Sequence, residues 1–375
     1  MIQKNSEREI LRILRRSGHI SRSKLSLQTG LSKPAVSEIV SGLISLGVIR
    51  EVKKGKSSSK GGKRPILLEF KPDYRYIIAI DVGGTKLRVA LTDLESRVIE
   101  TRVVSSKGVM RKDDLLNLIC KNISPFLEER EKILGIGIGV PGTVDMKNGF
   151  VYYMPAFNLR NIELKSMVQK EVDLPTLVAN DVNLNALGEM WKGAARGHKN
   201  VLLISLGTGT GAGIILDRHM CNGSRGMAGE IGYMITDWSR EKYNDFPFGN
   251  LEKWFSGYAL EKKLKEIGEN MSLKDFFERT ASSEDLNNIL NEACEHLALA
   301  MVNAICLLDP EVVVITGGIG FNQYDKIIEK IMPVFEKTVP AEIFQSISFK
   351  KSELGDMGVI VGANYLVQKE FFVVD

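Results

Sequence analysis

Hydrophobic and polar positions divide the chain into a short helical segment and a longer segment of mixed strands and helices. Near the N-terminus, apolar residues recur at helical spacing in three stretches, residues 5–16, 21–30 and 32–46. From about residue 76, apolar runs end at glycine-rich turns and alternate with helical patterns. The pattern therefore predicts a small N-terminal helical domain followed by an α/β body.

The second and third N-terminal helices carry clear boundary signals. Ser21 and Ser32 are the expected N-caps, because a serine hydroxyl accepts hydrogen bonds from the free N–H groups of a helix start. Gly30 ends the second helix, and Pro34 lies in the first turn of the third, where its missing N–H costs nothing. Two short helices joined at a glycine predict a helix-turn-helix.

A basic hairpin follows this helix pair. The stretch VIREVKKGKSSSKGGKRPILLEF, residues 48–70, places a loop of Lys, Ser and Gly between two apolar strands. A solvated surface loop is one interpretation; a DNA-binding wing that lies along a minor groove is favoured, because the capped helices come directly before it. The candidate residues for binding double-stranded operator DNA are Ser32, Lys33, Ser37, Lys63 and Arg64.

Charge separates the same two segments. Residues 1–72 hold 16 Lys and Arg against 5 Asp and Glu, a net charge of +11; the whole chain has +4, which leaves −7 for the remainder. A basic head on an acidic body indicates a polyanionic partner for the head only.

Three segments far apart in the chain each read as a strand followed by a glycine turn: residues 76–94, 200–216 and 311–320. Glycines let backbone N–H groups approach a phosphate, and Asp81 stands where a carboxylate could hold the water shell of a metal ion. One such turn is usually only a hairpin, but three suit a nucleotide held between two lobes, with ATP and Mg²⁺ as possible cofactors. The candidate nucleotide-binding residues are Asp81, Gly83, Gly84, Thr85, Lys86, Gly207, Thr208, Gly209, Gly317 and Gly318.

A polar pair lies at the end of another predicted strand. In LPTLVANDVNLNALGEMW, residues 174–191, a strand delivers Asn180 and Asp181 to its C-terminal end, and a helix follows. Ligand-binding groups collect at such strand ends in α/β proteins. Asp181 could act there as a general base on a hydroxyl, or it could be the N-cap of the following helix.

The glycine turns and VANDVNLNALGE together resemble the ROK family of repressors and sugar kinases, which is built on the actin-like ATPase fold. DVGGTK and LGTGTGAGI are similar to its two phosphate motifs, and ITGGI to its adenosine-side turn. GVPGTVD, NDVNLNALGE and GSRGMAGEIGY are similar to its sugar-side segments. The resemblance covers nearly the whole chain, and the N-terminal domain looks like that of the regulator branch, of the xylose and N-acetylglucosamine repressor type.

The resemblance implies roles for individual residues. Asp181 corresponds to the catalytic base that deprotonates a sugar hydroxyl. Carboxylates suit sugars because their oxygens accept hydrogen bonds from adjacent hydroxyls. The sugar-binding residues implied are Gly142, Asn180, Asp181, Glu230, Tyr233 and Glu252.

The chain departs from the family at a structural zinc site. The family has one His and three Cys there, and those positions are taken here by Tyr233, Tyr243, Asp245 and Asn250. Such side chains do not make a tetrahedral site of nitrogen and sulfur donors. We therefore expect no zinc, and packing by Phe246 and Phe248 in its place. The four histidines are isolated in the sequence and are expected to be surface or packing residues.

The implied architecture has three parts. We expect a winged helix-turn-helix at 1–72, a first α/β lobe at 73–190, and a second at 191–375 whose C-terminal helix, at about 356–369, packs back on the first lobe. A homo-oligomer, either a dimer or a tetramer, is also expected. Within the helical stretch before residue 310, an apolar stripe is either core or a dimer interface; its members are Leu297, Met301 and Ile305.

Two functions fit these features. A sugar-responsive transcriptional regulator, a repressor in which sugar binding modulates operator binding, accounts for the head and its charge. The alternative is an ATP-dependent sugar kinase carrying a DNA-binding domain, because the phosphate turns and Asp181 are retained. The sequence does not name the sugar.

Composition adds a cellular setting. No stretch approaches the ~20 apolar residues that span a bilayer, and the charged N-terminus lacks the apolar segment of a secretory signal. Four cysteines lie far apart and form no CxxC pair, so they are expected to be buried thiols in a reducing cytoplasm.

Overall fold

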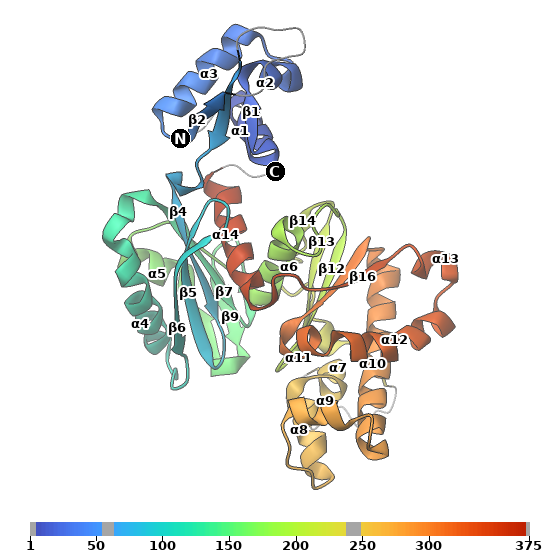
Figure 1. Ribbon diagram of the computed structural model, residues 1–375. Coiled ribbons are helices and arrows are strands. Elements are labelled where there is room, and N and C mark those ends of the chain that lie inside the picture. Colours follow the sequence, from blue (N-terminus) through green and yellow to red (C-terminus); the bar gives the residue numbers. More distant parts are fainter. Residues whose placement is uncertain (1–4, 55–63, 238–248, 373–375) are drawn as a thin grey trace.

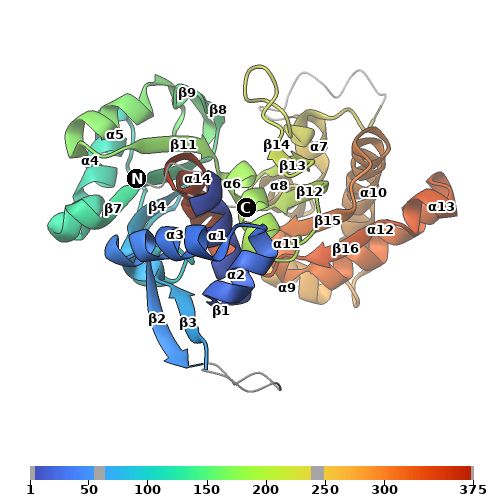
Figure 2. The same cartoon turned by 90° about the horizontal axis from the view of Figure 1, so that it is seen from above.

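The computed structural model describes residues 5–54, 64–237 and 249–372. A helical head stands on a body made of two α/β lobes, each with its own five-stranded sheet (Figure 1). Seen from above, the head lies over the region where helices from the two lobes meet (Figure 2). The mixed α/β architecture and the N-terminal winged helix-turn-helix agree with the sequence prediction.

The head is a winged helix-turn-helix. Ser21 caps its second helix by accepting from the Lys24 N–H, and Gly30 ends that helix with φ 71°. Ser32 caps the third helix by accepting from the Ala35 N–H. Three antiparallel strands in the order β1-β3-β2 complete the wing. The head elements are α1 (Asn5–Ser17), β1 (His19–Ser21), α2 (Arg22–Thr29), α3 (Lys33–Ser45), β2 (Ile49–Lys54) and β3 (Ile66–Phe70).

The first lobe is built on a sheet in the order β11-β7-β4-β5-β6, in which β4, β7 and β11 are parallel. Its strands are β4 (Tyr76–Val82), β5 (Lys86–Asp93), β6 (Val98–Ser105), β7 (Ile133–Val140) and β11 (Thr176–Asn180). A smaller antiparallel sheet consists of β8 (Thr143–Asp145), β9 (Phe150–Met154) and β10 (Leu159–Ile162). Helices α4 (Lys112–Ile123) and α5 (Leu164–Val172) supply part of the apolar core beneath the main sheet.

The second lobe has a sheet in the order β14-β13-β12-β15-β16. Its strands are β12 (Val201–Leu206), β13 (Thr210–Leu216), β14 (His219–Met220), β15 (Val312–Thr316) and β16 (Ser348–Lys351). Its helices are α7 (Asn250–Trp254), α8 (Gly257–Glu266), α9 (Leu273–Arg279), α10 (Glu284–Leu308), α11 (Gly317–Asn322), α12 (Tyr324–Thr338) and α13 (Ala341–Phe344). The stripe of Leu297, Met301 and Ile305 lies inside this lobe's core, so it is not a dimer interface.

Two helices join the lobes. Helix α6 (Asp181–Lys192) and helix α14 (Gly358–Phe371) share one buried cluster with residues of both sheets, such as Ala79 of β4 and Val314 of β15. The C-terminal helix α14 packs on strands β4 and β7 of the first lobe. Its last residues continue upward into the core of the head, where Val367 is fully buried.

One expectation about the cysteines is wrong. Cys294 is buried, and Cys120 and Cys221 are partly buried, but Cys306 is exposed on α10. The helical spacing around Cys306 does not place it on the buried stripe of Leu297 and Met301. All four cysteines are free thiols.

Candidate functional site

The first predicted phosphate turn joins β4 to β5. The Gly83 N–H donates to the Lys86 carbonyl at 2.9 Å, which closes the turn, while Gly84, Thr85 and Lys86 are exposed. A Cβ on Gly84 would lie 3.0 Å from the Ala156 Cβ, so a larger residue would crowd the neighbouring segment. The turn therefore presents backbone and a lysine to solvent.

The second and third turns lie side by side in the other lobe. A Cβ on Gly207 would lie 3.8 Å from the Gly318 nitrogen. Gly317 has φ 85°, which favours glycine, and a Cβ there would meet the Leu206 carbonyl oxygen at 2.4 Å. Thr208 and Gly209 are exposed at the same edge. The structure thus brings two of the three predicted turns together on one lobe and leaves the first on the facing lobe.

Two carboxylates of the first lobe, Asp81 and Asp181, are close enough to influence one another electrostatically. Asp81 is the next-to-last residue of β4, and Asp181 begins α6, where its Oδ1 accepts from the Val182 N–H at 2.9 Å. Burial raises the pKa of Asp181 to about 7, and the charges of Asp81 and Glu230 add to the effect. Burial also raises the pKa of Asp81 to about 6, against the opposing charges of Arg88 and Lys86. A carboxylate whose pKa is near neutrality is suited to general-base work on a hydroxyl.

Two further carboxylates belong to the second lobe. Glu252 of α7 accepts from the Thr210 N–H at 2.8 Å, and it fills the space that a Cβ on Gly209 would need. Burial raises the pKa of Glu230, and the neighbouring charge of Glu252 raises it further. Tyr233 is 58% exposed, and its pKa is raised by burial and by both glutamates. The three predicted sugar-side residues thus form one electrostatic group.

Asn180 has a structural task that the sequence prediction missed. It, rather than Asp181, is the N-cap of α6, because its Oδ1 accepts from the Asn183 N–H at 3.0 Å. Its Nδ2 donates to the Gly142 carbonyl at 3.1 Å. Gly142 itself packs so closely on β9 that a Cβ would lie 2.2 Å from the Tyr153 oxygen. The Asn180–Gly142 contact ties the start of α6 to the first lobe, and it leaves the Asp181 carboxylate free of the capping role.

Arg88 is a residue of this site that the sequence prediction missed. It lies directly opposite Asp81 in the β4–β5 pair, so the two side chains share one face of the sheet. Its guanidinium forms an ion pair with Asp356 and donates to the Asp356 carbonyl at 2.6 Å. The Arg88 side chain is 10% exposed, and its Nε is buried without a hydrogen-bond partner. A basic residue inside an alternating strand was the only available signal.

The region of the family's zinc site contains a different set of contacts. Asn250 Oδ1 accepts from the Thr236 N–H at 2.9 Å, and Thr236 Oγ1 lies 2.9 Å from His296 Nδ1. The His296 ring stacks on Trp254 with 4.0 Å between ring centroids, so it is a packing residue as predicted. Positions 243 and 245 and the two phenylalanines expected to replace the metal lie outside the described residues. Within the ranges that the structure describes, no three His, Cys, Asp or Glu residues are grouped to hold a metal ion.

Four of the five predicted DNA-contacting residues lie in the described part of the head. Ser32, Lys33 and Ser37 are exposed on the first turns of α3, and Arg64 is exposed just before β3. Lys63 lies outside the described residues. The apolar residues of α3 point inward, with Val36 and Val40 fully buried. The helix therefore offers a polar face of the kind that enters a DNA groove.

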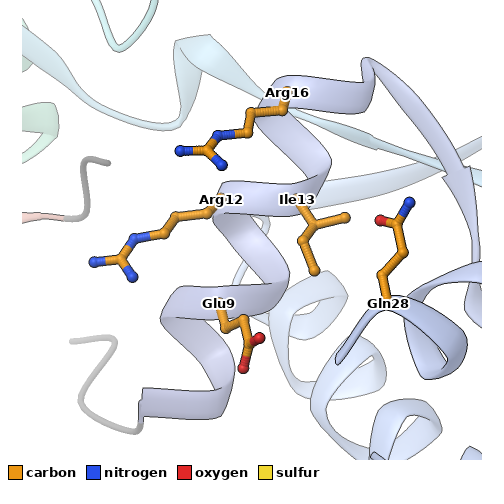
Figure 3. A pocket seen from close by; sticks show the side chains of 5 residues that line it. All are labelled: Glu9, Arg12, Ile13, Arg16 and Gln28. Carbon is orange, nitrogen blue, oxygen red and sulfur yellow. The ribbon is translucent and has the colours of Figure 1, made fainter. Parts of the chain in front are cut away.

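A pocket of about 420 Å³ lies on the head, between α1 and α2. Figure 3 shows Ile13 of α1 facing Gln28 of α2, with charged side chains along α1. Its lining residues are Glu9, Arg12, Ile13, Arg16 and Gln28. None of them is among the predicted sugar-binding or nucleotide-binding residues, which lie in the body.

Known proteins share both parts of this architecture. A model described as the ROK family matches residues 77–370, and one described as winged helix-turn-helix DNA-binding matches residues 4–50. The chain therefore belongs to the ROK family. None of the described helices is long and apolar enough to cross a membrane.

Individual relatives extend the likeness to full length. The xylose repressor of Bacillus spizizenii is 30% identical over 375 residues, which cover 99% of this chain and 96% of the repressor. A ROK family transcriptional regulator homologous to the E. coli MLC protein has a TM-score of 0.82 and 24% identity, covering 98% of this chain and 96% of its own. A ROK glucokinase from Streptomyces griseus, solved with glucose and AMPPNP, has a TM-score of 0.66 and 25% identity over 78% of this chain and 99% of its own.

Proposed function

We propose that this chain is a sugar-responsive transcriptional repressor of the ROK family. The observation that carries the proposal is the joining of an exposed, capped α3 and wing to a body whose carboxylates gather between two lobes. The full-length likeness to a xylose repressor supports it. In this proposal Ser32, Lys33, Ser37 and Arg64 contact DNA.

The sugar lies, in this proposal, between Asp181 and the glutamate pair. Asp181, Glu230 and Glu252 accept hydrogen bonds from adjacent hydroxyls, and Tyr233 covers the open side. Burial is the main cause that raises the pKa values of Asp181 and Glu252, so these carboxyls are partly removed from water. Neutral polyhydroxy ligands suit such a site better than anions do, because hydroxyls donate to carboxylates without adding negative charge.

A second candidate function is sugar phosphorylation with ATP. Two features favour it: the exposed glycine turns, and the Asp181 pKa near 7 that a general base needs. If Mg²⁺–ATP binds, Asp81 is the carboxylate placed to hold the metal's water shell, and Mg²⁺ would offset charge on the transferred phosphoryl group. Lys86 and the backbone N–H groups of the turns would then orient the phosphates.

A dimer is part of the proposal, since winged helix-turn-helix proteins read two half-sites one helical turn apart. The test uses the full chain and a DNA duplex selected by it from a random-sequence pool. Fluorescence anisotropy gives the DNA dissociation constant alone and with D-xylose, D-glucose or N-acetyl-D-glucosamine. One of these sugars should change that constant about fivefold or more.

Coupled ATP turnover with the same sugars separates the two functions. Sugar-dependent ADP release that is lost in Asp181→Asn would establish the kinase. Unchanged DNA affinity with every sugar would contradict the repressor.

A further inference from the structure

Helix α6 reaches from the proposed sugar site to the head. Asn180 and Asp181 stand at its first turn, and Trp191 and Lys192 stand at its last. Twelve residues at ~1.5 Å per residue give a rigid element about 18 Å long. The last turn of α6 lies next to α1 of the head, because the Trp191 ring of α6 contacts the Arg15 guanidinium of α1.

A three-residue ion bridge connects that last turn to the head. Glu95, in the turn between β5 and β6, accepts from Arg15 of α1, with 3.1 Å between Oε1 and Nε. Its other oxygen pairs with Lys192 of α6. Burial alone would raise the pKa of Glu95, but the charges of Arg15 and Lys192 hold it below its ordinary value. The carboxylate is therefore ionised at neutral pH and binds both cations.

Arg15 also contacts other groups of the body and of the wing. Its Nη2 donates to the Leu94 carbonyl at 2.6 Å. Its guanidinium carbon lies 5.8 Å from the Trp191 ring centroid and 5.1 Å from that of Phe70. The Arg15 side chain is 10% exposed, so these groups enclose most of it.

Helix α14 packs directly against α6, with the two backbones in contact. A Cβ on Gly188 of α6 would lie 2.4 Å from the Gly358 oxygen of α14, so no side chains separate the helices there. The far end of α14 enters the head, where Phe372 lies with its ring 6.3 Å from that of Phe70. The α14 residue Gln368 donates to the same Leu94 carbonyl that Arg15 uses.

We infer that sugar binding at the N-terminal end of α6 is transmitted to the DNA-binding head through the Arg15–Glu95–Lys192 bridge. The inference rests on the proposed repressor function and names its regulation. Sugar contacts with Asp181 favour one position of α6. The bridge then changes the position of α1 relative to the body. A ligand shifts the position of the head only if it binds the two conformations with different affinity. Removing the bridge therefore removes the coupling between sugar binding and DNA binding, and it leaves both binding sites intact.

The test variant is Glu95→Gln, which keeps the size of the side chain and removes its charge. The full chain is titrated with the selected DNA duplex, with and without the saturating sugar that affects the wild type. Calorimetry gives the sugar dissociation constant. We expect that constant to stay within about twofold of wild type, while the ratio of DNA dissociation constants falls by about fivefold or more toward one.

The matched control is Glu69→Gln. Glu69 lies on β3 and pairs with Arg50 at 2.8 Å, so this change removes a glutamate ion pair that lies wholly within the head. The ratio of DNA dissociation constants with and without sugar should be the same in Glu69→Gln as in the wild type. Lys192→Gln, at a side chain 32% exposed, is the second variant; it should reproduce the loss if Glu95→Gln does not fold.

The possible failures differ. If Glu95→Gln and Lys192→Gln both kept the wild-type ratio of DNA dissociation constants, the bridge would not transmit sugar binding. The proposed repressor function would be unaffected. Sugar binding without any DNA effect in the wild type would overturn both. If Glu69→Gln reduced the ratio of DNA dissociation constants as much as Glu95→Gln does, the role of the bridge would also be overturned. Loss of any charge in the head would then be enough to remove the effect of sugar on DNA binding.

Discussion

The close contact of α6 with α14 predicts a large effect for the smallest possible substitution. Gly362 of α14 faces the backbone of α6, and a Cβ added to it would lie 1.7 Å from the Leu184 carbonyl oxygen. Gly362→Ala therefore places a methyl group where a backbone oxygen already stands. The two helices must separate for the variant to fold.

The cost can be worked from the geometry. Ordinary contacts of a Cβ begin at 3.4 Å, so the methyl group is 1.7 Å too close. The obstructing atom is a backbone oxygen and cannot rotate away. Overpacking a well-filled core costs about 1–3 kcal/mol, and the fixed neighbour puts this site at the upper end, about 3 kcal/mol of unfolding free energy.

Urea denaturation followed by far-UV circular dichroism measures this loss. The control is Gly42→Ala in α3, where nothing lies within 4 Å of an added Cβ. That change should stabilise the chain by about 0.5–1 kcal/mol, because alanine is the better helix former. A Gly362→Ala midpoint equal to that of wild type would refute the backbone contact between α6 and α14.

Three further predictions concern the sites. Because burial raises the pKa of Asp181 from 3.8 to about 7, its contribution to stability is present below pH 3.8 and is lost as the pH rises through 7. The thermal midpoint of Asp181→Asn should therefore exceed that of wild type by a margin that grows up to about pH 7; a constant margin would contradict the buried carboxyl. Lys33→Ala and Arg64→Ala should each weaken DNA binding and lower the slope of log affinity against log salt by about 1 if the side chain contacts a phosphate. An unchanged slope in both would remove them from the interface. Metal analysis of the purified chain should find no stoichiometric zinc. One zinc per chain would contradict the expectation that the residues in place of the family's His and Cys ligands do not bind zinc.

Local signals in the sequence predicted local structure well. Ser21 and Ser32 cap the helices expected of them, because a cap depends on residues three positions apart. The segments with a strand followed by glycines predicted turns in both lobes, because a turn also depends only on residues close together in the sequence. The stripe of Leu297, Met301 and Ile305 was predicted as a stripe, but its burial in the core needed the fold.

Long-range pairs were not predictable in this way. Arg15 and Glu95 are 80 positions apart, and Glu95 and Lys192 are 97 apart. Arg88 meets Asp356 at a separation of 268. Each residue alone reads as an ordinary surface charge, and only the packing of head, α6 and α14 brings them together. The role of Asn180 as cap was missed because an adjacent Asp is an equally good capping residue.

The most direct test of the account is reciprocal calorimetry on the wild-type chain. The sugar that alters DNA binding is titrated into the free protein and into the protein bound to its selected duplex. Linkage requires the two sugar dissociation constants to differ by the same factor by which sugar changes the DNA dissociation constant, about fivefold or more. Equal sugar affinities in the two titrations would contradict the claim that this body senses sugar on behalf of the head.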